Sequence, residues 1–162
     1  MKTTRFLLPI LFAAAASCFA QDQAPPTFYK LDFVLKELDG GKVVNSRAYS
    51  SLLSSADKSR GSIRTGSRVP MASGGGGTQY IDVGTNIDFS FPKEMADRLV
   101  LDLAVDVSGA AAETSGMAPV VRQNKWQSTV VVPLRKATTV FTSDDPTSKR
   151  QLQLELTATP IK

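Results

Sequence analysis

Residues 80–91, YIDVGTNIDFSF, and residues 98–108, RLVLDLAVDVS, decide the fold of this chain. In the first stretch the odd positions are apolar except for Thr85, whereas the even positions from Asp82 onward are polar or glycine. In the second stretch every odd position from Leu99 to Val107 is apolar. A period of two is typical of a strand that buries one face. The two stretches therefore predict an antiparallel hairpin with a shared apolar face.

Similar alternation occurs on both sides of this hairpin. The turn sequence Asp39-Gly40-Gly41-Lys42 separates two predicted strands, because glycines accept positive φ angles without penalty. Loops or turns are expected at 54–62, at the glycine-rich 72–78, at 92–97 and at 109–118. The further strands are expected at residues 28–38, 43–53, 60–71, 128–133, 138–142 and 151–158. With no long helical pattern, the sequence predicts an all-β fold, either an antiparallel sheet or a small β-sandwich.

The first twenty residues are typical of a secretory signal peptide. Lys2 and Arg5 precede an apolar run that is too short to span a membrane, and Cys18-Phe19-Ala20 offers small residues at the two positions that a signal peptidase reads. We expect residues 21–26, QDQAPP, to be a flexible lead and residues 27–162 to be a single β-domain. The sequence before Cys18 is a degenerate lipoprotein signal, so cleavage after Ala20 is favoured over lipid anchoring at Cys18.

Composition limits the chemistry of the exported chain. Cys18 is the only cysteine, so cleavage after Ala20 leaves no thiol and no disulfide, and an exported domain must then depend on its apolar core. Removing Lys2 and Arg5 reduces the 19 basic residues to 17 against 15 acidic ones, which gives no basis for nucleic-acid binding. No later stretch has eighteen consecutive apolar residues, so no transmembrane helix is expected.

The sequence predicts no catalytic, cofactor or metal site. It contains no histidine, which excludes the Ser-His-Asp arrangement and imidazole zinc sites. Asp102 and Asp106 share a strand face but lie about 13 Å apart at strand rise, too far for paired acid–base work on one bond. A solvated polar face explains them. Asp144 and Asp145 lack the spaced ligands of a calcium loop and are interpreted as a turn.

Three residues are candidates for protein interaction. Arg64 and Arg68 share one face of an extended segment, where they could meet an acidic partner or anionic lipid head groups. The plainer interpretation, which we favour, is an edge strand guarded by positive charge, and Pro70 also indicates an edge. Trp126 is either a core anchor or an interface residue, and its packing area favours the core.

Four segments share a pattern with a known protein family: SIRTGSRVP at 62–70, YIDVGTNIDFSF at 80–91, QSTVVVPLRKATTVF at 127–141 and KRQLQLELTATPI at 149–161. They resemble the closing strands of the secretins, the multimeric outer-membrane pores of type II secretion and type IV pilus systems. The order and spacing of all four segments are similar over residues 62–161, whereas no counterpart is identified for residues 28–55.

This resemblance implies a small secretin-like β-domain with no catalytic residues. It also departs from the family. The chain has no room for the N-terminal ring-forming modules, and the gate segment is reduced to Ser143–Ser148. We therefore expect the chain to lack the ring modules and the gate of a full secretin.

The resulting hypothesis is an exported, non-enzymatic domain that acts in protein–protein interaction or assembly at the bacterial cell envelope, where the resemblance implies a link to type II secretion or type IV pilus machinery. Its partner would be an envelope protein or another copy of the chain, joined through sheet edges, with a possible outer-membrane association. The alternative is a periplasmic carrier of small molecules, in which the face of Leu99, Leu101, Leu103 and Val105 lines a cavity. A hydrolytic enzyme is disfavoured, because acid–base work would depend on carboxylates, lysine and tyrosine alone.

Overall fold

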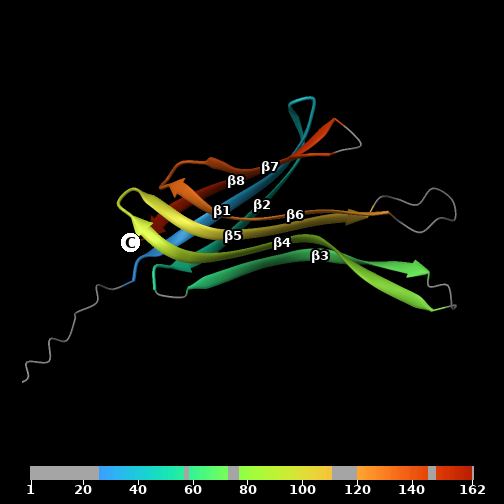
Figure 1. Ribbon diagram of the computed structural model, residues 1–162, viewed down its shortest axis with the longest axis horizontal. Helices are drawn as coiled ribbons and strands as arrows, with labels where there is room; N and C mark the ends of the chain where they lie inside the picture. The colour runs from blue at the N-terminus through green and yellow to red at the C-terminus, as the bar shows by residue number, and fades with distance from the viewer. Residues whose placement is uncertain (1–25, 57–58, 73–76, 111–119, 146–148, 162) are drawn as a thin grey trace, which may run out of the picture.

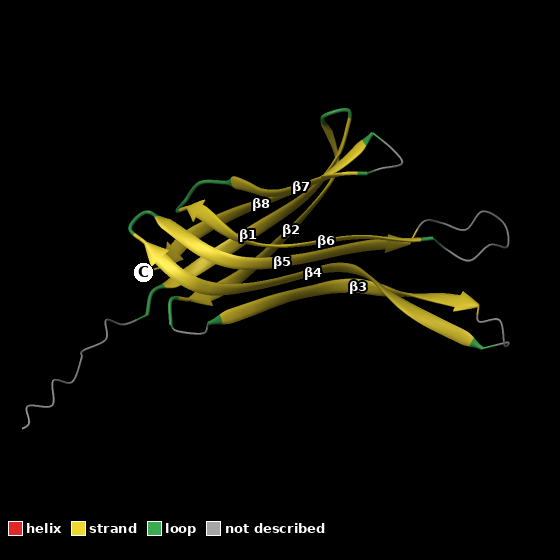
Figure 2. Ribbon diagram, in the orientation of Figure 1, coloured by secondary structure: helices red, strands yellow, loops and turns green. Residues whose placement is uncertain are grey.

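The computed structural model describes residues 26–56, 59–72, 77–110, 120–145 and 149–161. These ranges contain eight strands and no helix (Figure 2). The predicted signal peptide, Cys18 and the lead up to residue 25 lie outside the described residues, as do most of the glycine loop and the end of the reduced gate segment. The strands are β1 (Phe28–Asp39), β2 (Lys42–Ser54), β3 (Arg60–Ala72), β4 (Thr78–Met95), β5 (Arg98–Ala110), β6 (Val121–Pro133), β7 (Thr138–Asp144) and β8 (Arg150–Ile161).

The strands form two antiparallel four-stranded sheets, one in the order β2-β1-β8-β7 and the other in the order β3-β4-β5-β6. This confirms the all-β prediction. The β1–β2 turn is also confirmed, since Gly40 and Gly41 have φ angles of 57° and 82° and Asp39 pairs with Lys42. The sheets lie close together at the β4–β5 turn and diverge toward the β1–β2 turn (Figure 1).

Pairing between β1 and β8 joins the two ends of the domain. The register runs without interruption from Phe28 opposite Ile161 to Asp39 opposite Arg150. The chain passes from one sheet to the other after β6, where Leu134 donates its N–H to the Asp97 carbonyl at 2.9 Å and Arg135 donates to the Ala158 carbonyl at 2.8 Å. Residues 28–55 are therefore integral to the structure rather than an appendage.

The core lies between the inner faces of the two sheets. Phe33 of β1 meets Phe89 of β4 across it, with ring centroids 5.5 Å apart. The alternating faces predicted for β1, β5 and β8 are all buried, which confirms the period-two interpretation. The core members are Tyr29, Leu31, Phe33, Leu35, Leu53, Ile87, Phe89, Leu99, Leu101, Leu103, Val105, Val132, Leu154, Leu156 and Ala158.

Two polar side chains enter this apolar layer. Thr85, the polar exception in the β4 pattern, is buried, and among the described residues its Oγ1 has no hydrogen-bond partner. Burial raises the pKa of Tyr29, and a hydrogen bond with Glu94 raises it further. Because Tyr29 belongs to β1 and Glu94 to β4, this contact links the two sheets.

Two predicted boundaries were wrong. The expected turn at residues 92–97 is shorter, because β4 continues through Pro92 to Met95. The β4–β5 pairing has a bulge between Ser90 and Lys93, where an extra residue needs no ladder partner, so a residue without an N–H is accommodated. The loop expected from Gly109 also begins later, since β5 and β6 stay paired through Ala110 opposite Val121.

The core predicts the effect of truncating a buried leucine. Leu101 is fully buried, so Leu101→Ala should lower the free energy of unfolding by about 2–5 kcal/mol. Leu52 is 60% exposed, and Leu52→Ala, which removes the same atoms from the surface, should change it by less than about 0.5 kcal/mol. Urea denaturation of both variants measures this difference. Equal effects would contradict the assignment of the inner faces.

Candidate interaction surfaces

Arg64 and Arg68 lie on the outer face of β3, which is an edge strand of its sheet. Arg64 pairs with Asp88 at 2.5 Å, and Arg68 Nε donates to Asp82 Oδ1 at 3.0 Å. All four side chains are at least half exposed, so these ion pairs contribute little to stability. The two arginines are therefore exposed side chains arranged by the β3–β4 register.

The edge of β3 carries a row of backbone N–H groups that point away from β4. Gly84 donates its N–H to Ser108 Oγ of β5, so its N–H does not point toward β3. Gly66 lies directly opposite Gly84, so the two residues are a non-hydrogen-bonded pair of the antiparallel ladder. The N–H of Gly66 therefore points to the free edge. Ser62 lies four residues before Gly66 in an uninterrupted register, so its backbone N–H also points to the free edge. Pro70 lies four residues after Gly66, at a position where an N–H would point to the free edge, so a residue without an N–H is tolerated there.

A shallow notch lies where Gly66 faces Gly84. A Cβ atom on Gly84 would overlap the Thr65 carbonyl oxygen, and one on Gly66 would lie 2.5 Å from the Val83 carbonyl oxygen. The two backbones therefore approach too closely for any side chain at these positions. The notch has a volume of about 350 Å³, and Arg64 and Arg68 flank it.

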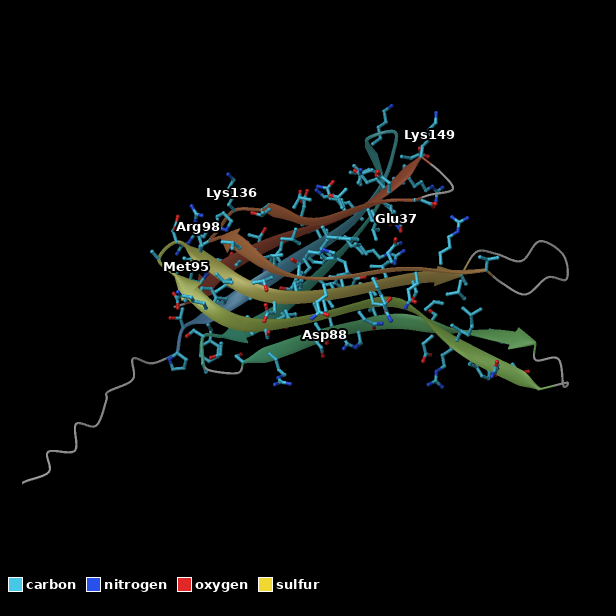
Figure 3. The ribbon with its side chains drawn as sticks, viewed as in Figure 1. Glu37, Asp88, Met95, Arg98, Lys136 and Lys149 are labelled. Carbon is cyan, nitrogen blue, oxygen red and sulfur yellow. The ribbon has the colours of Figure 1, made fainter. Side chains whose placement is uncertain are left out.

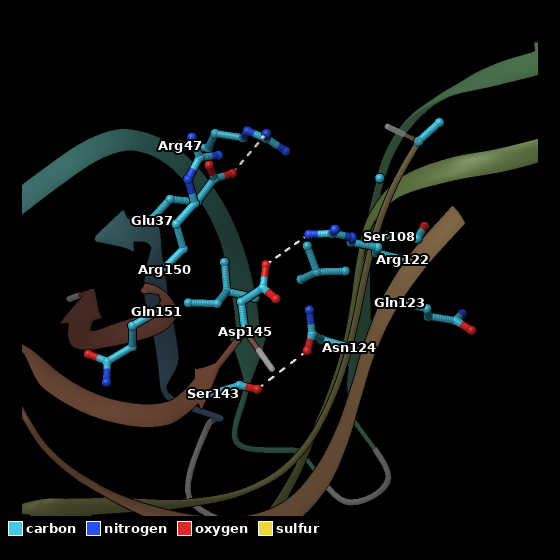
Figure 4. Close-up of a pocket in the computed structure, with 14 residues that line it drawn as sticks. Glu37, Arg47, Ser108, Arg122, Gln123, Asn124, Ser143, Asp145, Arg150 and Gln151 are labelled. Atoms are coloured by element: carbon cyan, nitrogen blue, oxygen red, sulfur yellow. Dashed lines mark hydrogen bonds and ion pairs between the residues drawn. The ribbon is translucent and has the colours of Figure 1, made fainter. Parts of the chain in front are cut away.

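A larger cleft of about 650 Å³ opens between the sheets where they diverge (Figure 4). Ion pairs join Arg47 to Glu37 at 3.3 Å within one sheet and Arg122 to Asp145 at 3.0 Å between the sheets. A further contact between the sheets joins the Ser143 hydroxyl to the Asn124 side-chain oxygen at 3.3 Å. In Figure 3, Met95 and Arg98 mark the closed end of the molecule, and Glu37 and Lys149 mark the diverging end. Polar contacts thus replace apolar packing at the diverging end.

Trp126 lies on β6 and is half-buried. Its ring packs on Phe141 of β7, with centroids 5.3 Å apart, and both rings pack against the core. The structure therefore places Trp126 in the packing between the sheets and not beside the two arginines. An interaction role for Trp126 stays a prediction.

The outer face of β1 carries a perturbed carboxylate. Partial desolvation opposes ionisation of Asp32, but a 2.7 Å hydrogen bond from the Ser50 hydroxyl and the Lys30 ammonium at 2.9 Å outweigh it, so the pKa of Asp32 is lowered. These partners stabilise the charged form of Asp32, as in an ordinary surface ion pair. The described ranges contain no group of three or more histidine, cysteine or acidic side chains able to hold a metal ion. They also contain no helix long and apolar enough to cross a membrane.

Comparison with solved structures shows which known fold this arrangement of strands is similar to. The chain superimposes on the type II secretin XcpQ of Pseudomonas aeruginosa with a TM-score of 0.60 and 11% identity. It superimposes on the secretin GspD of enteropathogenic Escherichia coli with a TM-score of 0.56 and 9% identity. For the type III injectisome secretin InvG of Salmonella the TM-score is 0.52 and the identity 10%.

The chain has the fold of a secretin β-domain. It spans 60% of the XcpQ chain, 70% of the GspD chain and 64% of the InvG chain. No family model matches the sequence, and no curated protein matches it. The likeness is therefore carried by backbone arrangement, with little sequence identity.

The superposition extends the likeness beyond the segments identified in the sequence. Residues 62–161 are 100 of the 162 residues, yet the match with XcpQ covers 87% of the chain. Residues before 62 must therefore take part, so the expectation that residues 28–55 have no secretin counterpart was too narrow. The pairing of β1 with β8 gives the physical reason, because these residues complete a sheet of the shared fold.

Sequence reasoning identified the arginines of the outer face but missed the glycine notch and the cleft. Isolated glycines within strand patterns are a signal for close backbone approach, and Gly66 and Gly84 gave that signal. Only the register shows that they face each other. Nothing in the sequence indicated the cleft, whose lining comes from strands of both sheets.

The notch predicts which glycine the fold needs. Gly84→Ala places a methyl group against the β3 backbone, which should lower the free energy of unfolding by roughly 3 kcal/mol. A methyl group on Gly109 would meet no atom within 4 Å, so Gly109→Ala is the matched control and should change stability by less than about 0.5 kcal/mol. Thermal denaturation followed by circular dichroism compares them. A Gly84→Ala protein as stable as Gly109→Ala would show that the strands do not meet here.

Proposed function

We propose that this chain is an exported, non-enzymatic β-domain that assembles at the bacterial cell envelope through the edges of one sheet. The observation that carries the proposal is the free edge of β3, with its row of outward N–H groups. An unpaired strand edge is a template for pairing with another chain. Assembly with further copies, or with another envelope chain, would satisfy it.

The geometry of the second sheet suits repeated pairing between copies. β3 and β6 form its two edges, and both strands are 13 residues long. Three antiparallel steps separate them, so β6 of one copy beside β3 of the next continues the antiparallel order. Such a head-to-tail contact produces a closed ring or an open filament, according to the rotation between copies.

The solved relatives support an envelope setting. Matching structures include a pilotin–secretin complex of AspS with GspD, and an outer-membrane complex of Klebsiella pneumoniae that contains PulD, PulS and a PulC domain. Those proteins act in assemblies with envelope partners. By this likeness we propose export and association with the outer membrane for the present chain, with the signal peptide at residues 1–20 and no lipid at Cys18.

For the carrier hypothesis, the structure offers a different ligand site from the one expected. Leu99, Leu101 and Leu103 are fully buried in a packed core, so the expected cavity along that face does not occur. The 650 Å³ cleft at the diverging end is within the size range of small-molecule sites and is where a carried ligand would bind. Native mass spectrometry of the purified protein tests this second candidate, because a carrier would retain ligand mass and an assembly domain would not.

Proline substitutions on the β3 edge test the assembly proposal. Ser62→Pro removes an N–H that points outward, so the fold should be retained and self-assembly or partner capture should weaken at least tenfold. Ser67→Pro is the matched control, because residue 67 has the opposite parity and its N–H points toward β4; it should cost about 2 kcal/mol of stability.

Mass photometry of the mature protein, together with cross-linking in envelope extracts, measures both outcomes, and thermal denaturation reports the fold. A wild-type protein that stays monomeric and cross-links to no envelope protein would contradict the proposal. So would Ser62→Pro assembling as well as wild type.

A further inference from the structure

The outer face of the β3–β4 hairpin has a self-complementary pattern that edge pairing does not use. Apart from two facing glycines, residues of this face on β3 stand directly opposite residues of different character on β4. The cross-strand pairs are Arg64 with Asn86, Gly66 with Gly84, Arg68 with Asp82 and Pro70 with Tyr80. The side chains of these pairs point away from the core, perpendicular to the strand edge. They form what we call the hairpin face.

Several features of the hairpin face leave it available for contact. Tyr80 is 63% exposed, although a tyrosine ring offers a large area for packing. The glycine notch between Arg64 and Arg68 removes side-chain bulk from the middle of the face. Positive charge follows β3 while negative charge follows β4, where Asp82 and Asp88 lie.

Two-fold symmetry turns this pattern into a matching surface. If two copies meet face to face about an axis parallel to the strands, β3 of each copy lies over β4 of the other at the same register. Arg68 then meets the Asp82 of the second copy, and Tyr80 meets its Pro70. An axis perpendicular to the strands and through the notch would instead lay β3 over β3 and place Arg68 over the Arg64 of the second copy, so the charges select one orientation.

We propose that the hairpin face is a docking surface for the same face of a second copy, with the two-fold axis parallel to β3 and β4. Sheets stacked face to face lie about 10 Å apart, which the arginine side chains can span. The paired notches admit close approach at the centre, and Tyr80 packs on Pro70 at the end. Opposite charges meet twice because a two-fold contact occurs twice. This contact is separate from the edge assembly, since it uses side chains of the outer face and no edge N–H.

Charge reversal tests the proposal in a Ser62→Pro background, in which the β3 edge is blocked. Arg68→Asp and Asp82→Arg should each weaken dimerisation at least tenfold, because like charges then meet across the interface. An equimolar mixture of the two single variants should restore a heterodimer, although neither chain regains its internal ion pair. Sedimentation velocity over a range of concentrations measures the three samples.

Arg98→Asp is the matched control. Arg98 forms a similarly exposed ion pair with Asp97 on the β4–β5 turn, and its reversal changes the net charge equally, so dimerisation should be unaffected. Tyr80→Ser should weaken dimerisation without changing the melting temperature. A parent protein that is monomeric at all concentrations, or a mixture that stays monomeric, would overturn the proposal. If Ser62→Pro still forms large assemblies, the edge proposal fails, and the same reversals measured in the wild-type chain still decide this one.

Discussion

The structure depends on one constraint: the apolar inner face of β4 and β5 must be covered by a second sheet. That face carries Ile87, Phe89 and the row from Leu99 to Val105, and water would otherwise contact all of it. The covering sheet is built from both ends of the domain, with β1 and β8 paired along their whole length. Because the cover lies on the inner face, the outer face and the edges of β3 and β6 are left for other contacts.

Much of the fold could be predicted because local alternation reports which face of a strand is buried. The β1–β2 turn, the β4–β5 hairpin and the edge position of β3 were all derived from residues close together in the chain. The β1–β8 register could not be, since periodicity carries no information about which distant strand is the partner. The sequence predicts a turn that begins at Pro92, whereas the structure continues β4 through a bulge, in which a residue without an N–H needs no ladder partner.

The candidate surfaces were also predictable only in part, where they depend on residues of a single strand. Sequence parity placed Arg64 and Arg68 on one face, but their carboxylate partners, Asp88 and Asp82, follow from the β3–β4 register. The glycine notch likewise requires Gly66 and Gly84 to be opposite each other. The cleft depends on two sheets diverging, a property of the whole molecule. Sites assembled across strands are therefore the part that a single sequence does not contain.

The proposed role in assembly depends on the two edges of the second sheet, β3 and β6. The edge of β3 and the hairpin face are proposed as two separate means of association, one through backbone N–H groups and the other through side chains. Together they would let a small domain extend a sheet in one direction and stack in another. The polar contacts at the diverging end bridge the two sheets without closing the cleft.

Amide hydrogen exchange of the monomeric chain, resolved by residue with NMR, tests the open-edged two-sheet fold most directly. We expect slow exchange for β1, β5 and β8, and, within β3, fast exchange at Ser62, Arg64 and Gly66 beside slower exchange at Thr65 and Ser67. Fast exchange throughout β1, or equal protection at Gly66 and Ser67 in the monomer, would contradict this fold.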